Sequence, residues 1–190
     1  MNINKAIRKQ KKALKRFMLS MGFIFLILPL VVYFTKIFSA FFLTYLGIIE
    51  ILIVFVIMMR ADKETLKFEY NNKLKIQNGI FKDRYIILCD RVMLVHTLNE
   101  GKDLEIIMIL KSRLRNKKIR PIDSRFLKKY SWFNKYYDNL KKQNNYKECY
   151  YLIINKGGYS KYELLDLIYR YSVKAYFTEN AIKRIKEYRN

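Results

Sequence analysis

The chain has 190 residues and a formal net charge of +22 at pH 7. This length allows one soluble domain of ordinary size beside a pair of long helices, and a second domain is not expected. The strongly basic balance favours an anionic partner, either a membrane surface or a nucleic acid.

Side chains that mark catalytic or metal sites are scarce. His96 is the only histidine, and Cys89 and Cys149 lie far apart without a CxxC neighbour. One histidine and two distant cysteines do not form a metal site, and no Gly-x-Ser-x-Gly elbow accompanies them. We therefore expect no enzyme, no metal and no cofactor. The cysteines are predicted to be reduced, buried thiols, and His96 a half-buried strand residue.

Residues 17–59 are the most informative segment, because Lys36 and Glu50 are their only charged side chains. A helix needs about 20 predominantly apolar residues to cross a hydrocarbon core about 30 Å thick. Lys36 divides the run into residues 17–35 and 37–59, which number 19 and 23. The sequence therefore predicts a membrane protein with a two-helix transmembrane hairpin that turns tightly near Lys36.

Basic residues flank this hairpin on one side. Residues 1–16 carry seven Lys and Arg side chains, and Arg60, Lys63 and Lys67 follow the second span. Because basic flanks tend to stay in the cytoplasm, we expect a multi-pass protein of the bacterial cell membrane with both termini cytoplasmic. A secretory signal peptide is not expected, since its apolar core is only about 7–15 residues long.

The tail of residues 1–16 is predicted to extend the first span as a basic cytoplasmic helix. It has too few apolar positions to bury a face. Two interpretations are open. The tail is either a topology signal alone, or it also contacts anionic lipid, which contributes about 1 kcal/mol per cation near the cytoplasmic leaflet.

The hydrophobic period changes to two after Thr65, which predicts strands. Asn71-Asn72 and Asn78-Gly79 are hairpin signals. The expected strands are residues 66–70, 73–76, 85–89, 92–97, 104–110 and 118–122, with a further one at 150–154. Short strands at spacings near ten residues predict a small antiparallel β sandwich or barrel.

Three helices are expected in the remainder of the chain. Apolar residues spaced by four and three predict a helix over residues 124–141, capped by Asp123 or Ser124. Ser160 and Glu163 fit a capping box ahead of a second helix, and a last helix begins at Thr178. Residues 60–190 are thus predicted to form one α+β cytoplasmic domain with a helical C-terminal part.

The β region resembles that of small bacterial membrane proteins that carry a pleckstrin-homology-like (PH-like) domain behind two N-terminal spans. The likeness rests on residues 74–81 (LKIQNGIF), 84–88 (RYIIL) and 90–95 (DRVMLV). It implies a strongly bent sheet of about seven strands closed by a helix, and a membrane or envelope role without a common enzymatic activity. Some members are associated with resistance to membrane-active peptides. The helix expected before strand 150–154 departs from that plan.

Glu50 is the candidate intramembrane polar site. An ionisable side chain at mid-membrane is costly and is by default a functional candidate. An antiparallel hairpin turning at Lys36 brings Glu50 level with Gly22 and near Ser20, so a protonated Glu50 can bond to Ser20 Oγ or pair across an oligomer. The alternative is a neutral, hydrogen-bonded carboxyl that only fixes helix packing.

A dense basic run follows the fifth expected strand and favours a phosphate-bearing partner. Since the domain is tethered at the cytoplasmic leaflet, anionic lipid headgroups are nearer than any nucleic acid. The alternative is a solvated loop in a lysine-rich protein. The run consists of Lys111, Arg113, Arg115, Lys117, Lys118, Arg120 and Arg125.

Trp132 and Tyr136 are candidates for an interfacial role. Their rings can lie at headgroup level while neighbouring lysines contact phosphates. The alternative is that this stripe packs on a sheet.

Three functional hypotheses follow. The first is a non-enzymatic scaffold, adaptor or envelope-protective protein that contacts anionic lipid and protein partners, which include other membrane proteins or further copies of the chain. The second is an accessory subunit of a transport or secretion complex that uses Glu50. The third is a membrane-tethered nucleic-acid binder, which is disfavoured because no helix-turn-helix, RNP-like motif or zinc spacing is present.

Overall fold

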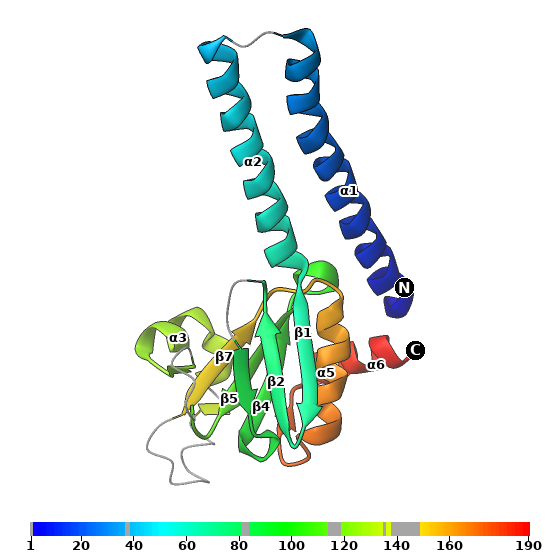
Figure 1. The fold of residues 1–190 in the computed structure, drawn as a ribbon. Coiled ribbons are helices and arrows are strands. Elements are labelled where there is room, and N and C mark those ends of the chain that lie inside the picture. Colours follow the sequence, from blue (N-terminus) through cyan, green and yellow to red (C-terminus); the bar gives the residue numbers. More distant parts are fainter. Residues whose placement is uncertain (1, 37–38, 81–83, 114–118, 135, 138–148) are drawn as a thin grey trace.

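The computed structural model describes residues 2–36, 39–80, 84–113, 119–134, 136–137 and 149–190. Two long helices, α1 (Ile3–Thr35) and α2 (Ala40–Glu64), lie side by side and project from a domain of strands and helices (Figure 1). Both are long and apolar enough to cross a membrane, and none of the residues in the most apolar stretch of either helix is fully buried. The expected layout of two apolar helices before an α+β domain is confirmed.

Helix α1 includes the basic tail, as the sequence predicted. It ends at Lys36, whose φ of 54° lies in the left-handed region, and α2 begins after Ser39. The connection is thus longer than a turn centred on Lys36. Helix α2 continues five residues beyond the predicted second span, to Glu64, and leads into the first strand through Thr65 alone.

The first sheet is an antiparallel meander. It consists of β1 (Leu66–Asn71), β2 (Lys73–Asn78) and β3 (Arg84–Ile87). Asn72 joins β1 to β2 with a φ of 55°, a left-handed conformation that asparagine tolerates better than most residues. The hairpin predicted at this point is therefore present.

The second sheet has the order β6-β7-β5-β4-β8. Its strands are β4 (Val92–Leu98), β5 (Glu105–Leu110), β6 (Arg120–Pro121), β7 (Tyr150–Ile154) and β8 (Tyr176–Phe177). Four of them pair antiparallel, as expected, whereas β8 runs parallel to β4 and was not predicted. Two residues are too few to show an alternating pattern.

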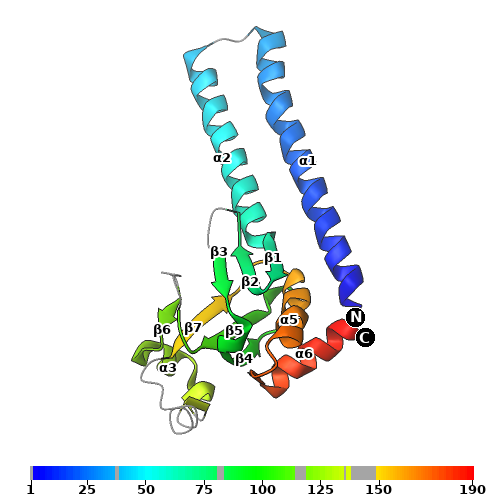
Figure 2. The ribbon, with the colours of Figure 1, turned by 60° about the horizontal axis from the view of Figure 1, so that its bottom comes forward.

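The second sheet is covered on both faces, which explains its nearly unbroken apolar runs. Val95, Ile106 and Met108 face a core shared with the first sheet and with helices α5 (Ser160–Tyr171) and α6 (Glu179–Arg189). The alternate residues of the same strands pack against α3 (Ser124–Lys129) and the turn after it. In Figure 2, α3 lies on one side of the strands and α5 and α6 on the other.

The helix predicted over residues 124–141 is shorter in the structure. Asp123 caps it through Phe126 N, as expected, but α3 ends at Lys129 because Tyr130 adopts φ −118° and ψ 63°. A 3-10 turn follows at Ser131–Phe133, and residues 138–148 lie outside the described part. The predicted apolar stripe still packs on the sheet, because the break at Tyr130 keeps Phe126 and Phe133 in one cluster.

The predicted capping box at Ser160 and Glu163 is not formed. Ser160 lies inside α5, and Tyr159 holds the capping position without a side-chain cap bond. Thr178 precedes α6 as expected, but its hydroxyl bonds to His96 Nδ1 at 2.9 Å instead of to the helix. Tertiary contacts thus replace both local caps.

Candidate functional site

The N-terminal end of α1 packs on the domain, contrary to the prediction that the tail cannot bury a face. Ile3 and Ile7 are 4% and 7% exposed and contact Leu104 and Tyr162. These isoleucines and Gln10 are spaced by four and three residues, so they share one side of the helix. Three positions are enough because the contact extends over only two turns.

Gln10 fastens this contact with two hydrogen bonds. Its Nε2 donates to Gly157 O at 3.2 Å, and its Oε1 accepts from Tyr159 N at 2.8 Å. The second bond satisfies a backbone N–H at the start of α5, where the local capping side chain is missing. A glutamine among seven cations gave no signal in the sequence, because its partners are about 150 residues away.

The end of α2 meets the same turn. Gly157 N donates to Lys63 O at 2.9 Å, and Lys156 forms an ion pair with Asp62. Asp62 Oδ1 also accepts from Ile80 N at 3.0 Å. The turn at residues 156–159 thus binds both long helices.

Glycines make this close approach possible. A Cβ atom at Gly157 would clash with Leu66, one at Gly158 with Gln10, and one at Gly79 with Asp62. All three have a positive φ, of 103°, 53° and 96° respectively, which favours glycine for a second reason. We call this region the junction: residues 2–13, 62–66, 79–80, 102–104 and 155–162.

The junction contains a buried lysine. Lys161 is 1% exposed, and its Nζ donates to Lys102 O at 2.8 Å and to Asn155 O at 3.0 Å. Burial lowers the pKa of its ammonium group from 10.5 to about 8, and the charges of Asp103 and Glu105 oppose this shift only in part. The two carbonyl acceptors are what make a buried ammonium tolerable.

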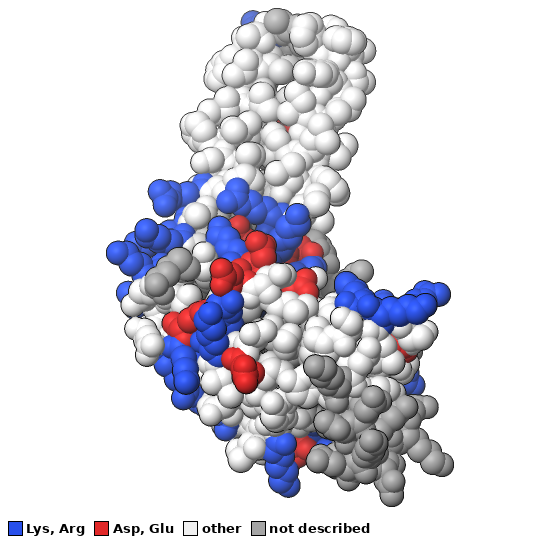
Figure 3. Space-filling model, turned by 180° about the vertical axis from the view of Figure 1, so that it is seen from behind, with Lys and Arg blue, Asp and Glu red and all other residues white. Residues whose placement is uncertain are grey.

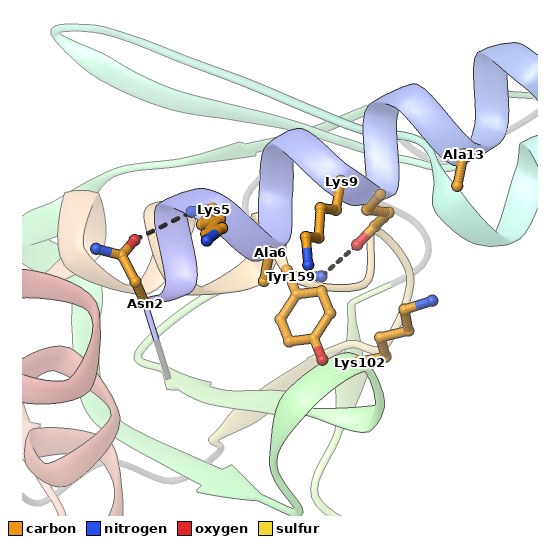
Figure 4. A pocket seen from close by; sticks show the side chains of 8 residues that line it. Asn2, Lys5, Ala6, Lys9, Ala13, Lys102 and Tyr159 are labelled. Carbon is orange, nitrogen blue, oxygen red and sulfur yellow. Dashed lines mark hydrogen bonds between the residues drawn. The ribbon is translucent and has the colours of Figure 1, made fainter.

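The junction contains an open cleft of about 390 Å³ between α1 and the domain. Figure 4 shows Lys9 and Ala13 on the side of α1 that faces Tyr159 and Lys102. Lys5 completes a set of three lysines, and we call this space the lysine cleft. No carboxylate is among the described residues that line it. The local potential is therefore positive.

A second hollow, of about 430 Å³, adjoins the first through Gln10 and Lys102. Its lining has both signs of charge, because Glu64 and Asp103 accompany Lys63 and Lys156. Acids and bases that neutralise one another make this hollow a weaker anion site than the lysine cleft.

Further cations gather where the apolar helices meet the domain. Lys12, Lys15, Arg16 and Lys63 are exposed there. Arg60 lies over the Phe17 ring at 4.1 Å, which ties the lower ends of the two apolar runs together. Figure 3 shows the helices as an almost uncharged column with lysines and arginines at its base.

The predicted basic run lies at the other end of the sheet. Strand β5 starts beside the junction and ends at Leu110, which pairs with Tyr150, about 17 Å further along at 3.4 Å per residue. Strand β7 runs antiparallel to β5, so Tyr150 lies at this far end and Ile154 at the end beside the junction. Described members of the run at this end are Lys111, Arg113, Arg120 and Arg125, whereas Arg115, Lys117 and Lys118 lie outside the described residues. The described members of the run therefore lie at the end of the sheet away from the two long helices.

Trp132 and Tyr136 are half-buried against the second sheet. The Trp132 ring stacks on His96 with centroids 3.6 Å apart, and Tyr136 contacts Tyr176. His96 is 6% exposed, more buried than predicted, and burial lowers its pKa from 6.5 to about 4. Trp132 and Tyr136 thus pack on the sheet, which the sequence analysis gave as the alternative to an interfacial role.

Glu50 is half-buried on the stripe of α2 that also contains Leu46, Ile53 and Arg60. It lies ten residues, or about 15 Å, beyond Arg60, and the same rise from Phe17 on α1 reaches Ile27. Ser20 is exposed and about 10 Å lower along α1. Glu50 is therefore about 10 Å from the level of Ser20 along the hairpin, and its pairing across an oligomer stays a prediction.

No group of three or more His, Cys, Asp or Glu side chains in the described part of the chain can hold a metal ion. Cys89 and Cys149 are both buried and free of disulfide bonds, as predicted. Burial raises the pKa of the Cys89 thiol, which disfavours the reactive thiolate.

No family model matches this chain, and no curated protein and no solved structure matches it either.

Proposed function

We propose that this chain is a non-enzymatic protein of the bacterial cell membrane. In this proposal α1 and α2 span the bilayer with both termini cytoplasmic, and the α+β domain is a scaffold or adaptor at the inner leaflet that binds anionic lipid. An envelope-protective role is the related possibility that the family resemblance suggests.

The observation that carries the proposal is the boundary between apolar and basic surface. Large apolar side chains are exposed along both helices, and a soluble protein rarely leaves such a continuous patch in water. The exposed cations Lys12, Lys15, Arg16 and Lys63 follow directly below that surface. In an anionic leaflet each contributes about 1 kcal/mol.

A PH-like arrangement of the domain is part of the proposal. A three-stranded antiparallel sheet packs against the sheet of β4, β5 and β7, and α5 closes the shared core. This agrees with a bent sheet of about seven strands closed by a helix. Strand β8, α3 and α6 are additions to that plan.

Lipid binding is tested with the full chain in nanodiscs of zwitterionic lipid, with and without an anionic lipid. We expect the anionic lipid to slow hydrogen exchange in residues 12–16 and 60–64. The response should disappear when the four cations at the base are replaced together: Lys12→Gln, Lys15→Gln, Arg16→Gln and Lys63→Gln.

The matched control removes four charges at the far end of the sheet. Lys111→Gln, Arg113→Gln, Arg120→Gln and Arg125→Gln together should leave the lipid response intact. Equal losses in the two quadruple variants would contradict a lipid site at the base, and release of the wild-type chain from membranes by alkaline carbonate would contradict spanning.

A second candidate function is supported by the position of Glu50 midway along α2 on its half-buried stripe. In this alternative the chain is a subunit of a membrane transport or secretion complex, and Glu50 pairs with another chain. Cross-linking in membranes should then give an oligomer that Glu50→Leu abolishes and Glu50→Gln preserves. A monomer in both variants and in the wild type argues against it.

A further inference from the structure

The three lysines of the lysine cleft take no part in the proposed lipid contact. Lys5 and Lys9 come from α1 and Lys102 from the connection between β4 and β5, so one small space collects cations from two parts of the chain. We propose that this cleft binds a soluble small molecule that carries phosphate groups. The proposal depends on the proposed function only in that α1 is taken to enter the membrane at Phe17.

The distance of the lysine cleft from the apolar boundary at Phe17 distinguishes a lipid headgroup from a soluble anion as its ligand. Lys9 and Lys5 lie eight and twelve residues before Phe17, or about 12 and 18 Å below the apolar boundary. The headgroup layer on one side of a bilayer is only about 5–7 Å thick. The cations at the base, such as Lys15 and Arg16, lie within that layer, whereas the lysine cleft lies beyond it. A phosphate group there comes from solution.

The size and chemistry of the cleft suit such a ligand. Its volume of about 390 Å³ is within the range of small-molecule sites, which is roughly 300–1,000 Å³. Each lysine ammonium offers three donors to phosphate oxygens. Asn2 and Tyr159 add neutral polar groups, and the positive end of the α1 dipole lies at the same place.

Binding would strengthen the contact between α1 and the domain. The ligand would bridge Lys5 and Lys9 on one side and Lys102 on the other, next to the hydrogen bonds of Gln10. A ligand that binds only the docked arrangement stabilises it by mass action. The cleft therefore links the concentration of a phosphorylated solute to the attachment of the first helix.

The test uses the full chain in nanodiscs of zwitterionic lipid and calorimetric titration with inorganic pyrophosphate. We expect saturable binding, and we expect Lys9→Gln and Lys102→Gln each to weaken it about tenfold or more, since each removes charge-assisted hydrogen bonds. The matched control is Lys11→Gln, which removes the same charge from an exposed position on α1 outside the cleft and should change affinity less than twofold. Thermal melting confirms that each variant is folded, and Lys5→Gln replaces any that is not.

Several results overturn the proposal. The proposal fails if the wild-type chain does not bind pyrophosphate. It also fails if Lys11→Gln and Lys9→Gln lose affinity for pyrophosphate equally. Competition by anionic lipid added to the nanodiscs would make a headgroup the ligand. The hydrogen-exchange response to anionic lipid is measured on the same protein variants. If the cleft does not bind pyrophosphate while that response is retained, this inference fails and the proposed function stands.

Discussion

The side chain of Gln10 occupies the space that a Cβ atom on Gly158 would need. The two residues belong to segments almost 150 positions apart, and any side chain at position 158 would displace Gln10. Through this contact and the ion pair of Asp62 with Lys156, the hairpin and the domain are held together by side chains as well as by the chain itself.

Gly158→Ala should destabilise the docked arrangement by about 1–3 kcal/mol, because alanine at a φ of 53° is strained and clashes with Gln10. Gln10→Ala should cost a similar amount by leaving Tyr159 N without its acceptor. The double variant should lose less than the two separate losses combined, since removing Gln10 relieves the clash. Chemical unfolding of the four proteins measures this, and strict additivity would contradict the described contact.

Asp62→Ala should weaken the junction more than Lys156→Met does. The Asp62 carboxylate accepts from Ile80 N as well as from Lys156, so its loss orphans a backbone donor and costs about 1–3 kcal/mol. Lys156 and Asp62 are both partly exposed, so removing only the lysine should cost about 1 kcal/mol or less. Hydrogen exchange at the Ile80 amide is the measurement, and equal effects in the two variants would be unexpected.

Lys161 should make stability rise with pH on the alkaline side. Its pKa is about 8 in the folded chain and 10.5 ordinarily, so between these values the unfolded chain binds more protons and folding strengthens as pH rises. The full gain is on the order of 3 kcal/mol, and below pH 8 the contribution is constant. Denaturant unfolding at pH 7.5, 9 and 10.5 measures it. Lys161→Met should flatten the rise, whereas an unchanged slope in that variant would exclude Lys161 as its source.

His96 should make stability fall as the pH is lowered on the acid side. Burial lowers its pKa to about 4, so between 6.5 and 4 the unfolded chain binds the proton and the folded chain does not. Acidification through this window should cost on the order of 3 kcal/mol. His96→Phe retains a ring against Trp132 and should lack this dependence, as unfolding midpoints at pH 4.5 and 6.5 will reveal; a variant that retains the full slope would point to another group.

Local patterns predicted most elements of the fold. The first hairpin could be predicted from Asn72, because the left-handed conformation of a turn residue depends only on its neighbours in the chain. The alternation of residues 66–78 likewise gave β1 and β2, since side chains on a strand point to opposite faces. The break at Tyr130 was not predicted because the apolar stripe continues across it.

The candidate site was much less predictable. Its parts come from α1, α2, the β4–β5 connection and the turn before α5, and each part has an ordinary local sequence. The predicted basic run was the densest in the sequence, but its described members lie at the far end of β5. Charge density along a chain does not show which surface a strand finally presents.

The sequence by itself determined the two apolar helices, the basic tail and the strand-rich domain, because length, hydrophobic period and turn residues act over a few neighbouring positions. Only the tertiary structure decided that Ile3, Ile7 and Gln10 dock on the domain, that Lys5 and Lys9 line one cleft with Lys102, and that Glu50 lies level with Ile27 instead of near Ser20. These relationships depend on contacts between segments distant in the chain, where packing and the exact length of the connections set the register.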